Sequence, residues 1–348
     1  MIQFKCFAAA CMVFTCALAC VAQNSHTEDP RLYAASARGD DIAVIDLNSL
    51  KVVGDIKLGG EKIHGVAVQP DGRRLFATVE SDHTLRIVDT ATNQAIGSVK
   101  VSGRPNQCAV TPDGKYVVVP IRDGDTVDII DVAQQKIVKS LPIKEPHNAL
   151  NTGSNRFMWV SAMSGHEVDL IDLEKMDYSV HIPVDGRPRP YVVSPDGKTM
   201  YVAIAELHGF EIVDIPAKKV IQRVEMPAEH PTPHPLQFET ADTRTHGLAL
   251  TQDGSELWVT SLLDDAVYIY DVKTKKIVGH VATGGGPNWV VVSPDGRYMC
   301  VSNTDSDDVS IIDVKSRREV ARIKAGKVPK RLAAANVPAV PPKEAAVK

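Results

Sequence analysis

Cysteine is scarce in this sequence outside its first twenty residues, where four of the six cysteines lie. The remaining two, Cys108 and Cys300, fall in predicted strands of different repeats, so we expect no disulfide framework. Both are expected to be small buried side chains. After its N-terminal segment the chain also lacks any apolar run long enough for a membrane helix, which excludes a later transmembrane span.

Strong charge and short catalytic motifs are missing as well. The formal net charge of −4 leaves no electrostatic footprint for nucleic acid, so nucleic acid is excluded as a partner. The sequence contains no G-x-S-x-G elbow, no phosphate-binding loop, no dinucleotide fingerprint and no H-E-x-x-H pair. Any reactive group must therefore be assembled by the fold from residues that lie far apart in the sequence.

The first 22 residues have the pattern of a secretory signal peptide. One cation, Lys5, precedes an apolar run from Phe7 to Val21 that is too short to be read as a membrane span. Cleavage after Ala22 is one expectation. The other is a lipid anchor at Cys20, because Ala17-Leu18-Ala19 before it approximates a bacterial lipoprotein box. Both place the protein in the periplasm or at the cell surface.

A repeat then runs down nearly the whole chain. Its marker is an apolar residue followed by Asp, and the steps between successive markers are 43, 42, 41, 42, 57 and 42 residues. The markers are Asp46, Asp89, Asp131, Asp172, Asp214, Asp271 and Asp313. A period in the low forties with alternating apolar residues indicates a β-propeller blade. We therefore predict an all-β, seven-bladed propeller over residues 31–336, with 337–348 as a flexible tail.

Turn chemistry divides each repeat into four strands, a to d from the axis outward. Pro112-Asp113-Gly114 is one a–b turn, because proline presets φ and glycine accepts the positive φ of a hairpin. The first repeat starts at Arg31 with the sequence of a b strand and lacks an inner strand. The segment from Val328 to Ala334 has an a-strand sequence. We expect it to pair into blade 1 and close the ring, which removes exposed strand edges.

The repeats resemble those of the YVTN β-propeller family, whose units read S-P-D-G-K-x-x-Y-V-x-N and end in V-x-V-I-D. The matching runs are Ser194 to Ala203 and Val290 to Val314, and the resemblance covers residues 31 to 335. It implies export to the periplasm or cell surface. It also implies distant kinship with propellers that bind quinone- or haem-enzyme partners and with lactone-cleaving propellers.

Aligning the blades places polar side chains at one mouth of the axial channel. The residue two positions before each a strand is polar, and three of the seven are histidines. This polar ring consists of His64, Asn106, His147, Arg189, His246, Asn288 and Lys330. His64, His147 and His246 come from blades 2, 4 and 6 and should approach the axis from three directions. Imidazoles are ligands for divalent transition metals. A metal site, contact with an organic or anionic ligand, and hydrated channel lining are the three interpretations.

Other residues extend this candidate site. Arg189 and Lys330 suit a carboxylate or phosphate, with solvation at the channel mouth as the alternative. Trp289 suits stacking on a ligand, or packing between blades. The connection from blade 5 to blade 6 is about 15 residues longer than the others, and we expect it to form an ordered flap that carries His230 and His234. A solvated loop is the alternative for these two histidines.

A second set, here named the loop ring, lies in the b–c loops, six residues before each repeated Asp. It consists of Asp40, His83, Asp125, His166, His208, Asp265 and Asp307. All seven are titratable, yet Asp in such loops is also ordinary turn chemistry. With the flap, eight of the eleven histidines map to one rim.

Two functions follow from this arrangement. The absence of catalytic motifs favours an exported, non-catalytic binding protein that uses the histidine-rich rim to hold a small ligand or a periplasmic or surface partner protein. The alternative is a metal- or cofactor-dependent enzyme or cofactor carrier, lactonase-like, lyase-like or haem-related, with its site at the channel mouth. The sequence leaves the cofactor unidentified, with a divalent transition metal as one option.

Overall fold

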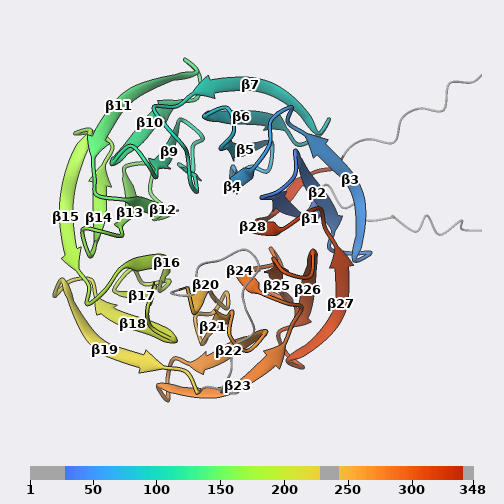
Figure 1. The fold of residues 1–348 in the computed structure, drawn as a ribbon, viewed down its shortest axis with the longest axis vertical. Helices are drawn as coiled ribbons and strands as arrows, with labels where there is room; N and C mark the ends of the chain where they lie inside the picture. The colour runs from blue at the N-terminus through green and yellow to red at the C-terminus, as the bar shows by residue number, and fades with distance from the viewer. Residues whose placement is uncertain (1–27, 228–242, 340–348) are drawn as a thin grey trace, which may run out of the picture.

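The protein is described from a computed structural model that covers residues 28–227 and 243–339. The predicted signal peptide, Cys20, His230 and His234 lie outside these residues, as does the tail from residue 340 onward. Within the two described ranges, no helix has the length and apolar character that a membrane crossing requires. The described strands form seven four-stranded antiparallel sheets arranged around one axis, which confirms the predicted seven-bladed propeller (Figure 1).

The strands of the first four blades run from the axis outward as follows. Blade 1 contains β28 (Pro329–Pro338), β1 (Glu28–Ser36), β2 (Asp41–Asp46) and β3 (Lys51–Lys57). Blade 2 contains β4 (Ile63–Val68), β5 (Arg74–Val79), β6 (Thr84–Asp89) and β7 (Gln94–Lys100). Blade 3 contains β8 (Ala109–Val110), β9 (Tyr116–Ile121), β10 (Thr126–Asp131) and β11 (Lys136–Pro142). Blade 4 contains β12 (Pro146–Asn151), β13 (Phe157–Ala162), β14 (Glu167–Asp172) and β15 (Asp177–Pro183).

The last three blades repeat the same order. Blade 5 contains β16 (Pro188–Val193), β17 (Thr199–Ile204), β18 (Gly209–Asp214) and β19 (Lys219–Glu225). Blade 6 contains β20 (Thr245–Leu250), β21 (Glu256–Ser261), β22 (Ala266–Asp271) and β23 (Lys276–Ala282). Blade 7 contains β24 (Pro287–Val292), β25 (Tyr298–Asn303), β26 (Asp308–Asp313) and β27 (Arg318–Lys324).

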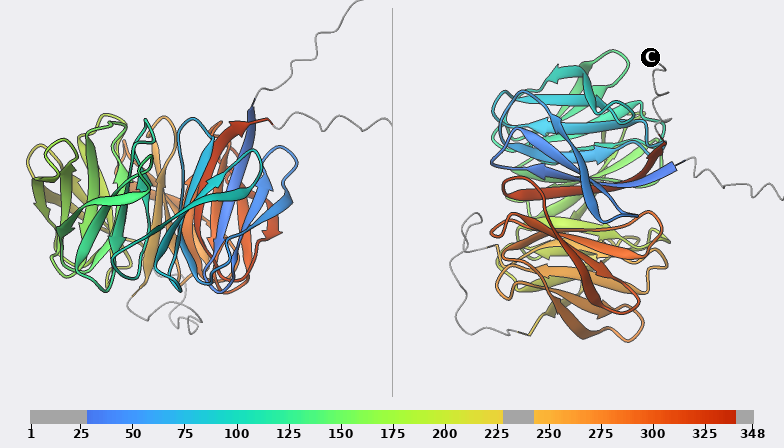
Figure 2. Two further views of the ribbon diagram at one scale, coloured as in Figure 1. Left: turned by 90° about the horizontal axis from the view of Figure 1, so that it is seen from above. Right: turned by 90° about the vertical axis from the view of Figure 1, so that its right-hand side faces the viewer.

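Blade 1 takes its inner strand from the other end of the chain, as predicted. β28 pairs antiparallel with β1 in a register that runs from Glu28 opposite Pro338 to Ser36 opposite Pro329. The pairing extends beyond the expected limits of 31 and 336, so Val337 lies in a strand. Both described ends therefore leave the propeller on the rim opposite the polar ring (Figure 2). This pairing covers the inner edge of β1, which would otherwise be exposed at the seam.

The apolar core lies between blades rather than inside them. Phe76 and Leu85 of blade 2, for example, pack with Val117 and Val119 of blade 3 in one buried cluster. The middle strands are buried almost throughout, whereas outer strands such as β19 alternate between exposed and half-buried residues. A single four-stranded sheet could not cover both of its faces, so each blade depends on its two neighbours.

The two cysteines of the described chain are buried and unpaired, as expected. Burial raises the pKa of the Cys108 thiol to about 12 and raises that of Cys300 as well. Neither thiol is therefore a nucleophile near neutral pH.

The loop ring is explained mainly by turn geometry. Five of its members adopt left-handed φ angles of 46–56°, a region in which Asp and His are enriched among residues that carry a side chain. Three of its carboxylates also accept a backbone amide of the d–a connection that leads into the next blade. These bonds join Asp125 to Glu145 at 2.9 Å, Asp265 to Gly286 at 2.8 Å and Asp307 to Val328 at 2.7 Å. Three of the four acidic members thus link neighbouring blades.

The seam predicts a large cost for Leu332→Ala. Leu332 on β28 is 2% exposed and packs with Leu32 and Ile311 across the junction of blades 7 and 1. Removing a buried leucine side chain should lower the free energy of unfolding by about 2–5 kcal/mol. Urea unfolding with an unchanged m-value measures this loss. Val53→Ala on β3 is the control, because Val53 is 52% exposed and should change stability by less than about 0.5 kcal/mol. Equal effects of the two substitutions would contradict the packed seam.

Candidate functional site

A β-bulge places each member of the polar ring. In every blade the innermost strand carries one more residue than its partner at this point, so the pairing register shifts. The shifts lie between Ile63 and Val66, Pro105 and Ala109, Pro146 and Ala149, Pro188 and Tyr191, Thr245 and Leu248, Pro287 and Trp289, and Pro329 and Arg331. A bulge redirects the side chain of the extra residue. We expected the ring to precede the inner strands, but six of its members lie within them and only Asn106 precedes its strand.

The polar ring is buried rather than open to solvent. All seven side chains belong to residues that are at most 6% exposed, and His246, Asn106 and Asn288 are fully covered. Polar groups this deep require partners, because burying an unpaired one costs on the order of 1–3 kcal/mol. The contacts of the ring therefore indicate what it is arranged to hold.

His64 is paired with a carboxylate that the sequence analysis missed. Its Nδ1 donates a short hydrogen bond to Oε1 of Glu80, the residue that follows β5. Burial, together with the charges of Lys330 and Arg331, lowers the pKa of His64 to about 3 even though the Glu80 bond raises it. The imidazole is therefore neutral, and its lone pair lies on Nε2, a buried atom without a hydrogen-bond partner among the described residues.

Glu80 is the ionised member of this pair. Burial raises the pKa of Glu80, but the hydrogen bond from His64 and the charges around it outweigh burial and lower it to about 2. A carboxylate that accepts Nδ1–H fixes both the tautomer and the orientation of the imidazole. The sequence contains one weak signal for Glu80. Glu80 and Arg122 are the only charged residues at the position directly after a b strand.

His147 and His246 lie side by side. Their ring centroids are 5.4 Å apart with the rings inclined by 67°, and His246 lies 5.8 Å from the ring of Trp289. Nδ1 of His246 donates to the backbone carbonyl of Asn288 at 3.0 Å, which puts its lone pair on Nε2. Burial first, and then Arg189 and other cations, hold the pKa of His147 well below its usual value. We expected Trp289 either to stack on a ligand or to pack between blades. Its place beside the ring of His246 is compatible with both.

Buried cations surround the three imidazoles. Arg189 donates to the Thr243 hydroxyl at 2.8 Å, and Arg331 donates to the Asn288 side-chain oxygen at 3.0 Å. The Arg331 guanidinium also lies 4.4 Å from the centre of the Trp289 ring. Arg331 was missed by the sequence analysis. The sequence carries one weak signal for it: among the seven residues that directly follow a ring member, only Arg331 is charged.

Among the described residues, cations outnumber carboxylates around the ring histidines. The charges that most affect His64 and His147 come from four cations and one carboxylate: Arg122, Arg189, Lys330, Arg331 and Glu80. Guanidinium and ammonium groups in a buried setting bind carboxylates and phosphates well. The site is thus suited to a carboxylate or phosphate held beside neutral imidazoles.

The three ring histidines do not form a compact ligand cluster in this arrangement. Across the residues that the structure describes, only Glu167, Asp169 and His181 form a group of three or more ligand atoms lying within 4.8 Å of one another. A metal held jointly by His64, His147 and His246 would require side-chain movement and stays a prediction.

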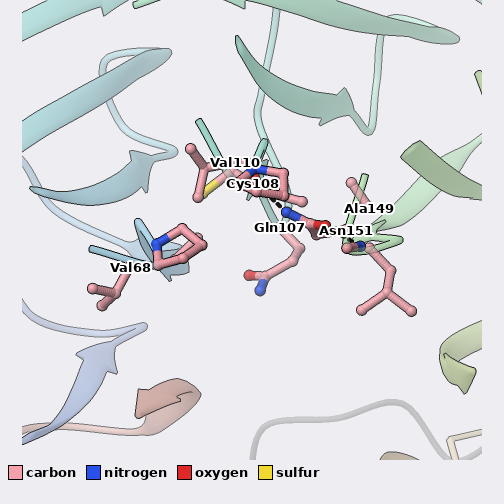
Figure 3. A pocket seen from close by; sticks show the side chains of 12 residues that line it. Val68, Gln107, Cys108, Val110, Ala149 and Asn151 are labelled. Atoms are coloured by element: carbon pink, nitrogen blue, oxygen red, sulfur yellow. Dashed lines mark hydrogen bonds between the residues drawn. The ribbon is translucent and has the colours of Figure 1, made fainter. Parts of the chain in front are cut away.

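The opposite end of the channel has a different character. A cavity of about 570 Å³ opens between β4, β8 and β12 near the a–b turns, where Val68, Val110 and Ala149 line it (Figure 3). Its lining includes Gln107 and Asn151 but no carboxylate, imidazole or cation. The Cys108 thiol there has a raised pKa, so it is not a nucleophile. This cavity could therefore hold an apolar group, but its lining offers no acid, base or nucleophile.

Comparison with known proteins gives one family match. The family described as lactonase, 7-bladed beta-propeller, matches residues 67–329. No curated protein matches the chain.

Among solved structures of similar fold is a Bacteroides fragilis protein named as a candidate 6-phosphogluconolactonase, at 14% identity and a TM-score of 0.72, covering 89% of this chain and 99% of that one. Dihydro-heme d1 dehydrogenase NirN in complex with DHE is 13% identical with a TM-score of 0.64, covering 84% of this chain and 63% of that one. Hydrazine synthase of Kuenenia stuttgartiensis is 20% identical with a TM-score of 0.52, covering 74% and 97%. At these identities the likeness is one of fold.

The family match contradicts our first functional interpretation. We favoured an exported, non-catalytic binding protein because no local catalytic motif is present, but the matched family is named for an enzyme activity. The interpretation was wrong because it looked for motifs contiguous in sequence. In this fold, reactive groups such as His64, Glu80 and Lys330 meet from different strands and blades.

The neutral state of His64 predicts a pH-dependent stability. Its pKa is about 3 in the folded protein and about 6.5 in an unfolded chain, so the unfolded state binds more protons below pH 6.5. Stability should therefore fall as the pH falls, and between pH 7 and pH 5 this residue alone should remove about 2 kcal/mol. Urea unfolding of the wild type and of His64→Gln at both pH values measures the difference. Equal losses in the two proteins would show that His64 is not held neutral.

Proposed function

The chain belongs to the seven-bladed β-propeller lactonase family, and from this premise we propose that it is a hydrolase that opens an anionic lactone at the polar ring. The observation that carries the proposal is the His64–Glu80 pair, with an unpartnered, buried Nε2 beside Lys330 and Arg331. Lactone hydrolysis requires a base for water and positive charge for the oxyanion, and this site has both.

His64 is the proposed general base. Its Nε2 lone pair accepts a proton from a water molecule as the water oxygen attacks the lactone carbonyl. Glu80 acts as a positioning residue, because its carboxylate holds Nδ1–H and stabilises the imidazolium that forms. Burial is the main cause of the low pKa of His64, and Lys330 and Arg331 lower it further. An anionic lactone would offset these two charges and would so make His64 a stronger base on binding.

The cations complete the reaction. A guanidinium stabilises the negative charge that develops on the carbonyl oxygen in the tetrahedral intermediate. The ring C–O bond then breaks, and the His64 imidazolium returns its proton to the leaving alkoxide, which yields a hydroxy acid. Lys330 and Arg331 are adjacent residues of β28. In this mechanism one of them binds the acidic substituent of the substrate, and the other stabilises the reacting carbonyl.

We also propose that this hydrolase is exported. The N-terminal pattern of residues 1–22 and the likeness of the repeats to YVTN units support the periplasm or cell surface. Signal-peptide cleavage after Ala22 and a lipid anchor at Cys20 both agree with that location.

A second candidate function, carriage of a haem-type cofactor, is favoured by the same Nε2 atom. A neutral, oriented imidazole such as His64 could ligate the iron of such a group, and the buried cations could pair with its carboxylates. One protein of similar fold is named as dihydro-heme d1 dehydrogenase NirN in complex with DHE. When bound, such a group would supply redox chemistry, and this chain would supply His64 as a ligand and Arg189 and Lys330 as partners for its acidic groups.

Substitution at the dyad tests the hydrolase proposal. With a phosphorylated sugar lactone as substrate, His64→Ala should lower kcat by about 100-fold or more, because the base is removed. Glu80→Gln should lower kcat less, because it disturbs only the orientation of the base. Stopped-flow pH-indicator assays of the acid released measure both. His83→Asn is the matched control, since His83 occupies a left-handed turn position that asparagine also adopts. An equal loss in His83→Asn, or full activity in His64→Ala, would contradict the proposal.

Removing one cation tests the substrate charge. Lys330→Met should raise KM for the phosphorylated lactone by about tenfold, the value of one lost charge-assisted contact. KM for the uncharged sugar lactone should stay nearly constant. If both substrates respond alike, Lys330 does not select an anion.

Visible absorption separates the second candidate from the first. Protein purified without a tag from its exporting host should show no Soret band and no stoichiometric iron if it is a hydrolase. A Soret band that is lost in His64→Ala would favour the cofactor carrier instead.

A further inference from the structure

We propose that Glu167, Asp169 and His181 on blade 4 form a binding site for a divalent transition-metal ion of the zinc class. The site lies on β14 and β15, the two outer strands of the blade, away from the polar ring. It requires no step of the proposed lactone hydrolysis, so the two proposals stand or fall separately.

Strand register brings the three ligands together. His181 on β15 lies directly opposite Asp169 on β14, and Glu167 precedes Asp169 by two residues, which places it on the same face of the sheet. Nδ1 of His181 is 2.9 Å from Oδ1 of Asp169 and 3.8 Å from Oε2 of Glu167. Bonds of about 2.0–2.2 Å to zinc imply ligand atoms roughly 3–4 Å apart. The two distances from His181 are close to this ligand spacing, so small side-chain rotations would bring the three ligand atoms around one ion.

The other blades show what this strand position does when it is structural. In blades 3, 5 and 7, the polar residue equivalent to Asp169 accepts the amide of the d–a connection that enters its blade. These bonds join Asp128 to the Ser102 amide at 2.8 Å, Glu211 to the Asp185 amide at 3.1 Å and Ser310 to the Gly284 amide at 3.3 Å. In blade 4 the equivalent amide belongs to Lys144, and no hydrogen bond joins it to Asp169 in the described structure. Asp169 is thus released from the blade-linking role.

Blade 4 also lacks the cation that blade 5 has opposite its acidic residue. In blade 5, Arg223 stands opposite Glu211 and lies 3.7 Å from it. In blade 4 that place is taken by His181, and a second carboxylate, Glu167, is added. Within residues 28–227 and 243–339, neither Glu167 nor Asp169 forms an ion pair with lysine or arginine. Two carboxylates and one imidazole therefore share a site that lacks a fixed cation.

Burial of the Asp169 carboxylate makes the absence of a neighbouring cation important. The Asp169 side chain is 3% exposed, and its carboxylate lies on the same face of the sheet as the carboxylate of Glu167. A divalent cation would supply the positive charge that no lysine or arginine supplies here, and would offset the repulsion between the two carboxylates.

The site is nevertheless open on one side. The side chains of His181 and Glu167 are 56% and 35% exposed, so an ion can enter and can keep water as its further ligand. Tyr178 supports His181 from the same strand: the two rings lie 5.5 Å apart, and the Tyr178 hydroxyl donates to the carbonyl of Pro142 in blade 3. One nitrogen and two carboxylates as donors favour zinc or cobalt over calcium, which takes six to eight oxygens.

Metal titration tests the site. Zn²⁺ is titrated by calorimetry into the full exported chain, and Co²⁺ is followed by its visible absorption. One ion per chain is expected at this site, with Ca²⁺ binding more weakly. His181→Ala and Asp169→Asn should each weaken the Zn²⁺ affinity by about tenfold or more, because a ligand is lost. Glu167→Gln, at a half-exposed position that leaves the fold intact, should weaken it in the same direction even if Asp169→Asn fails to fold.

Two controls isolate the cluster. His280→Ala removes an exposed histidine from the same cross-strand position of blade 6, opposite Tyr268, where no carboxylate pair exists, and should leave Zn²⁺ affinity unchanged. His64→Ala tests binding at the polar ring and should also leave this ion in place. Unchanged Zn²⁺ affinity in both His181→Ala and Glu167→Gln would overturn the proposal. So would a loss in His280→Ala as large as that in His181→Ala. Lactone hydrolysis by the His181→Ala protein should match the wild type, so failure of this site remains distinct from failure of the hydrolase.

Discussion

The pairing of β28 with β1 is the constraint on which the rest of the structure depends. It supplies the inner strand of blade 1 from the far end of the chain and brings Lys330 and Arg331 next to His64 of blade 2. Without that pairing the ring would have an open seam and the polar ring would lack two of its cations. Stability and the candidate chemistry thus share one structural cause.

The polar ring illustrates how a repeat produces a site without a motif. Every inner strand has a bulge at the same point, so every blade delivers one side chain to the axis. The backbone geometry is common to all seven, while the side chains differ. Their individual contacts, such as His64 with Glu80 and His246 with the Asn288 carbonyl, set the tautomers and the charge balance. Divergence at equivalent positions therefore carries the functional information.

Comparing equivalent positions in different blades also shows which polar residues have a structural role and which do not. Three of the four acidic members of the loop ring bond to the connection that leads into the next blade, and Asp128 and Glu211 bond to the connection that enters their own blade. Asp169 occupies the same strand position without such a bond and faces a histidine instead. A polar residue that its counterparts do not explain is a reasonable place to look for a ligand.

The sequence by itself determined the number of blades, the seam and the members of the polar ring, because each depends on a local period of alternating strands and turns. It also located Cys108 and Cys300 as buried thiols. Only the tertiary structure decided that Glu80 and Arg331 join the ring and that His181 meets Glu167 and Asp169. These contacts depend on bulges and cross-strand register, and a shift of one residue moves a side chain to the other face of its sheet. Such registers arise from packing between blades, which no local pattern records.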